Sequence, residues 1–400
     1  MAELLVRFGD SDVALLERVL AAPAAHARPD RVVLDATVGA FQPRFASATR
    51  RAGVPLLVDP LTYLLQDFQH AAAKWAHLPY ARAAAFSPSE LQSPVRQAGL
   101  VSSCIDHQLG LGATAIIPPY VHIDRVDGGW LDVQVGLWRR TRRYLDQQDL
   151  ALPVVAVTAV GWRLLSRNCW SAGVNRLLSS ILDLGADEIA LAASKVDQGS
   201  HPDQRLVDLV ATIDHMRSYR PVLAWRQGLL GEAAVAAGAR GYETGLGWRE
   251  VCDLGRAMTA DRRPVSPDAA FGARPVYIPA LGRSIPKRSL EVLLGTRLSP
   301  QLLCMDYQCC PEGQLSLLGD ARAHALTSRA GRLHALDRVD RHAWRWRRLA
   351  DGAADGLELT GRINRLAESR PAIKTVNTNA LTAIQAVADN RRQTLRRRAA

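Results

Sequence analysis

The strongest constraint on the fold is an alternation of short apolar runs with longer amphipathic stretches over most of the chain. Eight β-branched runs precede or separate stretches of helical periodicity, at residues 31–37, 54–60, 113–120, 153–160, 188–196, 221–227, 239–245 and 275–282. Runs that are apolar on both faces suit parallel strands covered by helices. Eight such units in about 250 residues predict an α/β fold of the (β/α)8 TIM-barrel type.

An open doubly wound sheet is the alternative fold. Such a sheet normally has a glycine-rich first turn, whereas the sequence after Asp35 reads ATVGAFQ. The barrel is therefore favoured. We expect the barrel over residues 1–300, a Cys/His-containing insertion after strand eight over 301–345, and a partly helical, basic C-terminal extension over 346–400.

The charge of the chain is unevenly distributed. The net charge is +11, and residues 271–400 carry this whole excess, with 22 basic and 11 acidic side chains. Such asymmetry is typical of proteins that bind a polyanion, which suggests a nucleic acid partner. A solubilising tail explains it equally well, and only four of the basic residues are lysines, as expected from a GC-rich genome.

The composition indicates which class of protein the chain belongs to and in which compartment we expect it. With 48% hydrophobic and 22% charged residues the chain has globular composition. No apolar run approaches the roughly 18 residues of a membrane span, and the first residues lack a basic signal-peptide region. Six cysteines in 400 residues suggest a reducing compartment. We expect a cytoplasmic protein with no membrane partner; a homodimer and protein partners in a larger complex stay open.

Carboxylates stand at three predicted strand ends, which is where barrels place their chemistry. Asp35, Asp59 and Glu243 are the catalytic candidates, because a carboxylate can act as nucleophile or general base. Asp35 and Asp59 could instead cap the helices that follow. Side chains and glycines near the same ends are candidates for substrate binding, with the aromatic rings stacking on a flat substrate; they are Tyr120, Trp225, Arg226, Gln227, Tyr242, Gly245 and Gly247.

A cysteine cluster is the strongest local motif. Cys304, Cys309 and Cys310 fall within seven residues, and His334 lies 25 residues after Cys309. Thiolate and imidazole ligands at a tetrahedral site are typical of intracellular zinc. The spacing predicts a structural zinc bound by at least two of the cysteines, with His334 as the histidine ligand. Three buried, inert thiols are the alternative.

This arrangement resembles the tRNA-guanine transglycosylase superfamily, which includes relatives acting on DNA. In that family a barrel carries a metal-binding insertion after its last strand, and the histidine lies in a segment like SRAYLHHL, where this chain reads SRAGRLHAL over residues 328–336. The family's cysteines read CxCxxC instead of CxxxxCC, and its DSGGFQ corresponds here to DPLT over residues 59–62. The resemblance implies that Asp59 recognises a purine-type base and that Glu243 stands where the family has a nucleophilic aspartate.

Three functions follow from these patterns. The first is a transglycosylase-like enzyme that exchanges or removes a purine-type base in tRNA or DNA through a carboxylate nucleophile. The second is a barrel enzyme acting on a phosphorylated small molecule, with glycines after strand seven near its phosphate. The third is a non-catalytic barrel that binds nucleic acid or a protein partner. Fold alone does not choose among them.

Overall fold

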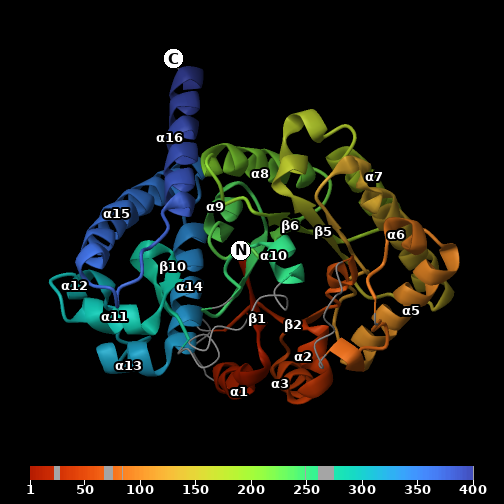
Figure 1. The fold of residues 1–400 in the computed structure, drawn as a ribbon, viewed down its shortest axis with the longest axis horizontal. Coiled ribbons are helices and arrows are strands. Elements are labelled where there is room, and N and C mark those ends of the chain that lie inside the picture. Colours follow the sequence, from red (N-terminus) through yellow and green to blue (C-terminus); the bar gives the residue numbers. More distant parts are fainter. Residues whose placement is uncertain (22–27, 67–74, 83, 248, 260–273, 400) are drawn as a thin grey trace.

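The computed structural model describes residues 1–21, 28–66, 75–82, 84–247, 249–259 and 274–399, with side chains up to residue 391. Within these residues, eight parallel strands form one sheet in the order β3-β2-β1-β8-β7-β6-β5-β4. They are β1 (Glu3–Phe8), β2 (Arg31–Asp35), β3 (Leu56–Asp59), β4 (His122–Ile123), β5 (Val155–Gly161), β6 (Glu188–Ser194), β7 (Val222–Ala224) and β8 (Gly241–Gly245). This curled sheet with its outer helices confirms the predicted barrel class (Figure 1).

Helices follow the strands and cover the outside of the sheet (Figure 1). Their amphipathic faces bury apolar residues against strands such as β5 and β6, which are buried over their whole length. They are α1 (Val13–Ala21), α2 (Ala36–Phe41), α3 (Arg44–Ala52), α4 (Pro88–Leu91), α5 (Pro94–Gly110), α6 (Trp130–Gln147), α7 (Val174–Leu184), α8 (Pro202–Met216) and α9 (Gly231–Ala236). The short helix α10 (Leu254–Met258) lies instead near the carboxyl ends of the strands, where the backbone N–H of Leu254 donates to the Ser194 hydroxyl.

The strands of the barrel begin and end earlier in the chain than the apolar runs from which they were predicted. The missed strand is β1, which pairs with β2 on one side and β8 on the other. Its two charged residues, Glu3 and Arg7, interrupt the apolar pattern from which the other strands were predicted. The run at 275–282 is no barrel strand: within it β9 (Val276–Ile278) pairs antiparallel with β10 (Arg283–Ile285). The predicted strand over 113–120 is also wrong in detail, since only an isolated bridge joins Ile116 to Val154.

The extended segment before β4 spans the two edges of the sheet. The backbone N–H of Thr114 donates to the carbonyl of Leu56 in β3 at 2.9 Å, and that of Ile116 donates to Pro153, before β5, at 2.8 Å. Nearer the carboxyl ends, the Thr62 hydroxyl donates to the Tyr120 carbonyl at 2.7 Å. These bonds take the place of a strand ladder between β3 and β4.

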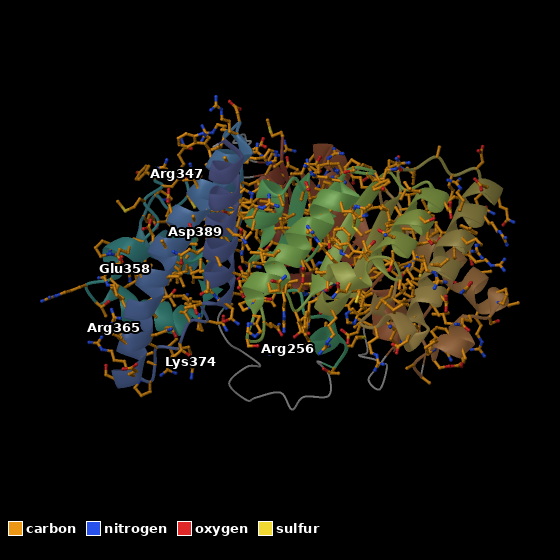
Figure 2. The ribbon with its side chains drawn as sticks, turned by 90° about the horizontal axis from the view of Figure 1, so that it is seen from above. Arg256, Arg347, Glu358, Arg365, Lys374 and Asp389 are labelled. Atoms are coloured by element: carbon orange, nitrogen blue, oxygen red, sulfur yellow. The ribbon has the colours of Figure 1, made fainter. Side chains whose placement is uncertain are left out.

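The remaining chain forms a C-terminal layer at the side of the barrel. Beyond β10 it contains α11 (Lys287–Leu294), α12 (Ser299–Leu302), α13 (Gln314–Gly319), α14 (Ala321–Asp337), α15 (His342–Ser369) and α16 (Asn379–Ala399). A second apolar core joins β9, β10, α11 and α12 to α15. Helix α16 packs on α15 and on α8 of the barrel. The helices of this layer agree with the predicted helical C-terminal extension. Figure 2 shows this layer beside the barrel, with Arg347, Glu358 and Arg365 along its flank.

No helix in the described part of the chain is both long and apolar enough to cross a membrane.

Candidate functional site

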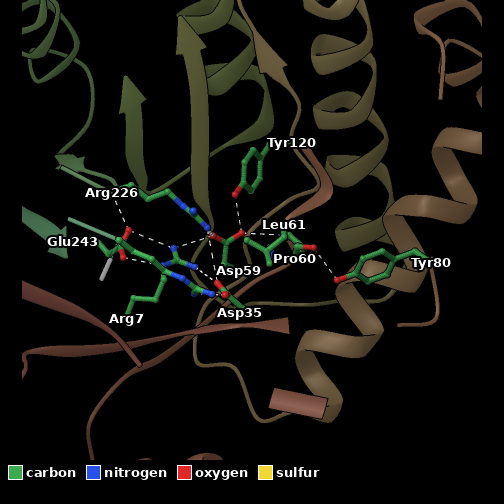
Figure 3. A network of polar contacts seen from close by, with 10 residues as sticks. Arg7, Asp35, Asp59, Pro60, Leu61, Tyr80, Tyr120, Arg226 and Glu243 are labelled. Atoms are coloured by element: carbon green, nitrogen blue, oxygen red, sulfur yellow. Dashed lines mark hydrogen bonds and ion pairs between the residues drawn. The ribbon is translucent and has the colours of Figure 1, made fainter. Parts of the chain in front are cut away.

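Arg7 lies at the centre of a buried ionic network at the carboxyl ends of the strands (Figure 3). Its fully buried guanidinium pairs with Asp35 at the end of β2, with Asp59 at the end of β3 and with Glu243 in β8. The Nη2–Oδ2 distance to Asp59 is 2.9 Å, and the Nε–Oε1 distance to Glu243 is 2.8 Å. The three predicted catalytic carboxylates therefore meet around one arginine that the sequence did not reveal.

Asp59 has donors on both carboxylate oxygens. Its Oδ1 accepts from the Tyr120 hydroxyl at 2.8 Å and from the backbone N–H of Leu61 at 2.9 Å. Its Oδ2 faces Arg7 and also Arg226, whose Nη2 lies 3.4 Å away. The side chain is fully buried. Asp59 is thus held rigidly, as part of the floor of the site.

Glu243 is held in the same way. Its Oε2 accepts from the backbone N–H of Arg226 at 2.8 Å, besides the bonds to Arg7. Arg226 has the left-handed backbone conformation, with φ 59°. A non-glycine residue in that region costs free energy and is common where a side chain must be aimed at a site. This turn directs the Arg226 guanidinium towards Asp59 and Asp35.

Asp35 is the carboxylate nearest the surface. It occupies the position before α2, yet its side chain makes no capping hydrogen bond, so the helix-cap alternative is wrong for it. Its oxygens pair with Arg7 and with Arg249, whose side chain is 47% exposed. Burial alone would raise the pKa of Asp35, but Arg249 and Arg7 lower it well below the usual range. Asp35 is therefore an ionised carboxylate behind an exposed arginine.

We call this group of residues the Arg7 network. Its positive and negative charges balance. Three carboxylates face three guanidinium groups: Arg7, Arg226 and Arg249. Burial opposes the charge on Arg7, while Glu243, Asp59 and Asp35 raise its pKa. A cavity of about 230 Å³ adjoins the network and is lined by Arg7, Gly9, Asp12, Leu246, Arg249 and Arg274.

The predicted aromatic residues divide between the site and the core. Tyr120 belongs to the site, where it stacks on Tyr63 with ring centres 5.7 Å apart. Trp225 is fully buried, with its ring centre 5.4 Å from the Arg7 guanidinium. Tyr242 packs on the other side of the sheet, where a Cβ on Gly231 of α9 would meet its ring at 2.2 Å. Because neighbours in a strand face opposite sides, Tyr242 and Glu243 cannot both point into the barrel.

The other predicted binding residues support the backbone around the network. Gln227 donates from Nε2 to the Ala193 carbonyl at 2.7 Å and is 3% exposed. Gly245 pairs with Arg7 in the β1–β8 ladder. Gly247 has φ 78°, and a Cβ there would lie 2.7 Å from the Pro275 carbonyl, so close approach of the backbone requires a glycine.

The cysteine cluster assembles with a different histidine from the one predicted. One ligand atom each from Cys304, Cys309, Cys310 and His324 lie within 4.8 Å of one another. Nδ1 of His324 is 3.3 Å from the Cys309 sulfur and 3.5 Å from that of Cys310. His334 was the wrong choice: it sits ten residues further along α14, about 15 Å along the helix axis.

The surroundings of His324 suit a metal ligand. Its Nε2 lies 2.9 Å from the Tyr277 carbonyl, so Nε2–H donates there and Nδ1 is left facing the sulfurs. Metal-bound histidines commonly have such a second hydrogen bond, which fixes the tautomer. The hydrogen bond from Cys310, assisted by His324, lowers the pKa of Cys309 against the effect of burial. Three sulfurs and one nitrogen form a donor set that zinc prefers.

Helix α14 connects this cluster with the barrel. Five residues after His324, the buried Arg329 donates to Oε1 of Glu250 at 2.6 Å and to the Gly228 carbonyl at 2.8 Å. Its guanidinium also lies 4.2 Å from the ring centre of Tyr277, whose carbonyl holds His324. Glu250 directly follows Arg249 of the Arg7 network. One helix therefore anchors both the cysteine cluster and the loop after β8.

Comparisons with known proteins assign the chain to no family. No family model matches the sequence, and no curated protein matches it. Thiamine phosphate pyrophosphorylase from Pyrococcus furiosus aligns with 11% identity over 65% of this chain and 94% of that chain, with a TM-score of 0.32. A GH18 chitinase from Pseudoalteromonas aurantia aligns with 10% identity over 61% and 93%, with a TM-score of 0.38. Similarities this weak carry no argument about activity, and the fold assignment rests on the strand order.

Proposed function

We propose that the chain is a barrel enzyme that exchanges or removes a purine-type base in nucleic acid, as a divergent relative of the tRNA-guanine transglycosylases. The observation that carries this proposal is the convergence of Asp35, Asp59 and Glu243 around Arg7, at the end of the barrel where such enzymes work. Breaking an N-glycosidic bond builds positive charge on the sugar carbon. An ionised carboxylate beside that carbon stabilises the charge or attacks the carbon.

Asp35 is the carboxylate that we assign to the sugar carbon. Its partner Arg249 is exposed, so a substrate phosphate can compete for that arginine and leave Oδ2 of Asp35 free to face the sugar, while Oδ1 stays paired with Arg7. Asp59 and Glu243 are fully buried and bonded on both oxygens. In this assignment they orient Arg7 and Arg226. Glu243 as the nucleophile, which the family resemblance implied, is the competing assignment.

The family part of the proposal is supported by the position of a Cys/His cluster after the last barrel strand, although its histidine is His324 and not the His334 of the segment that resembles the family. A zinc held by Cys304, Cys309, Cys310 and His324 would join the loop before α13 to α14. Such a four-coordinate site has no open position, so its role is structural. The basic residues beyond position 270 would supply the phosphate contacts.

The test is incorporation of labelled guanine into tRNA and duplex DNA, together with release of the original base. We expect turnover with one of these nucleic acids and a loss of at least about 100-fold in Asp35→Asn. Asp183→Asn, which alters an exposed carboxylate of α7, is the matched control and should keep full activity. A large loss in Glu243→Gln with Asp35→Asn still active would favour the competing assignment.

A folded, metal-loaded protein that neither exchanges nor releases a base from either nucleic acid would contradict the proposal. The second candidate is then an enzyme acting on a phosphorylated small molecule. The observation in its favour is the 230 Å³ cavity beside Arg7, with Arg249 and Arg274 in its lining. Saturable binding of inorganic phosphate that is lost in Arg249→Ala, without binding of nucleic acid, would support it. Tight nucleic acid binding without turnover would indicate the non-catalytic alternative.

A further inference from the structure

A second cavity lies between the barrel and the C-terminal layer and shares no residue with the Arg7 network. Its volume is about 270 Å³, and it opens between α9, the turn at Pro279–Leu281, and helices α14, α15 and α16. Its apolar lining is aliphatic and comes from both sides, with Leu229, Leu281, Leu336, Leu349, Leu381 and Ile384. Leucine side chains without a stacking ring suit an aliphatic group more than a nucleobase.

The polar lining of this cavity carries excess positive charge. Among the residues that the structure describes, the lining contains Arg283, Arg332 and Arg348 but a single acid, Glu232. Both oxygens of Glu232 are bonded to Arg332, at 2.6 Å and 2.8 Å. Because Glu232 is already paired with Arg332, it does not neutralise Arg283 or Arg348.

Arg283 and Arg348 differ in how many other groups already bind their guanidinium groups. Arg283 donates from Nη1 to the Asn377 carbonyl at 2.6 Å and also faces Asp197, which is outside the lining. Arg348 lies near enough to Glu232 to lower its pKa, but it forms no ion pair among the residues the structure describes. Its guanidinium is therefore the group best placed to accept an anion at the rim.

We propose that this cavity binds a small organic anion, in which a phosphate or carboxylate head is attached to an aliphatic body. The head pairs with Arg348 and Arg283, and the body displaces water from the leucine-lined interior. Because residues of α9 and of α14 to α16 all line the cavity, the ligand would join the C-terminal layer to the barrel.

Gly352 of α15 offers a way to fill the cavity without disturbing the fold. It lines the cavity, and a Cβ placed on it would meet no atom within 4 Å. One turn further on, a Cβ at Gly356 would lie 2.7 Å from the Ala280 carbonyl. Gly352 is exposed and so lies at the rim of the cavity. Gly352→Leu should therefore place an aliphatic side chain in the opening and block entry, and removing a glycine from a helix interior favours folding.

The experiment is calorimetric titration of the full chain with hexyl phosphate, heptanoate, inorganic phosphate and 1-hexanol. We expect saturable binding of hexyl phosphate or heptanoate at one site, at least about tenfold weaker binding of inorganic phosphate, and none of hexanol. The better of the two amphiphiles identifies the head group. Arg348→Ala should weaken binding at least about tenfold, as expected for loss of a charge-assisted pair, and Gly352→Leu should abolish it.

Arg347→Ala is the matched control, because Arg347 neighbours Arg348 in sequence but packs over Trp344 and pairs with Asp351 outside the cavity. Its binding should equal that of the unaltered chain. Two results would overturn the proposal: no binding of either amphiphile at millimolar concentration, or equal binding by the unaltered chain and by Gly352→Leu. Base exchange is measured separately, so failure of this site leaves the proposed reaction untouched.

Discussion

At the scale of single residues, Arg7 is a charge in the middle of a buried strand that is tolerated because three carboxylates surround it. Its removal would leave those carboxylates buried without their shared partner. We predict that Arg7→Met lowers the free energy of unfolding by about 3–5 kcal/mol, the usual cost of breaking a buried ion pair. Urea denaturation measures this change.

Arg44→Met is the control for that measurement. Arg44 pairs with Glu17 on the surface, where its side chain is 66% exposed, and exposed pairs contribute about 1 kcal/mol or less. Equal losses in the two variants would show that the Arg7 network does not stabilise the fold.

His122 gives the protein a pH-dependent stability. Burial lowers its pKa to about 4, so the folded state keeps it neutral while the unfolded state gains a proton below about pH 6.5. The free energy of unfolding should therefore fall between pH 6.5 and pH 4, by up to roughly 3 kcal/mol from this residue. His122→Asn should flatten that slope in urea titrations at several pH values. The exposed His201→Asn should leave it unchanged; an unaltered slope in His122→Asn would contradict the prediction.

The candidate site could be predicted from the sequence only in part. Asp35, Asp59 and Glu243 were found because strand ends in a barrel converge. Arg7 was not, since a charge inside an apolar run argues against a buried strand until its partners are known. Those partners come from residues 28 to 236 positions away, and no local pattern contains them.

At the scale of elements, the predicted number of barrel strands was correct, but the predicted strands were displaced by one along the chain. The eight parallel strands begin with β1 and end with β8, one unit earlier than expected. Residues 275–282 have the composition of a barrel strand, but they form part of an antiparallel pair whose apolar side chains enter the second core. Composition alone cannot tell whether such a run is buried in the barrel or in the second core.

The cysteine cluster makes a prediction that separates the two histidines. We expect about one zinc per chain in protein purified without chelator, lost in Cys309→Ser and His324→Ala and kept in His334→Ala. Three sulfurs and Nδ1 of His324 complete the site, whereas His334 is remote from it. Elemental analysis gives the metal content, and loss of metal should also expose the loop before α13 to limited proteolysis. Equal metal in His324→Ala and His334→Ala would show the ligand set to be wrong.

At the scale of the whole molecule, the C-terminal layer is bound to the barrel by apolar packing up to the last described side chains. Val387 and Ala388 of α16 are buried, and the Arg391 guanidinium lies 5.1 Å from the ring centre of Trp346. The side chains of residues 392–400 lie outside the described part. Their four arginines can therefore be removed without disturbing any contact described above.

Deletion of residues 392–400 tests the proposed role of this basic end in binding nucleic acid. For each phosphate that the shortened chain no longer neutralises, the log–log slope of binding against salt should fall by roughly 0.7–0.9, with weaker binding at low salt. The melting temperature should stay within a few degrees, because the packing described for α16 up to Arg391 remains. Fluorescence anisotropy with tRNA and duplex DNA over a range of salt gives the slope. Unchanged affinity at every salt concentration would exclude the tail from the interface.

The position of β1 has a consequence for how the protein is made. Glu3 pairs with Gly241, so the second side of β1 stays open until the ribosome has produced most of the barrel. At translation rates of about 5–20 residues per second this takes on the order of ten seconds or more. An unpaired apolar strand is prone to aggregate during that time, and charges within it oppose aggregation. Glu3 and Arg7 would thus protect the nascent chain before either reaches its partners in the finished sheet.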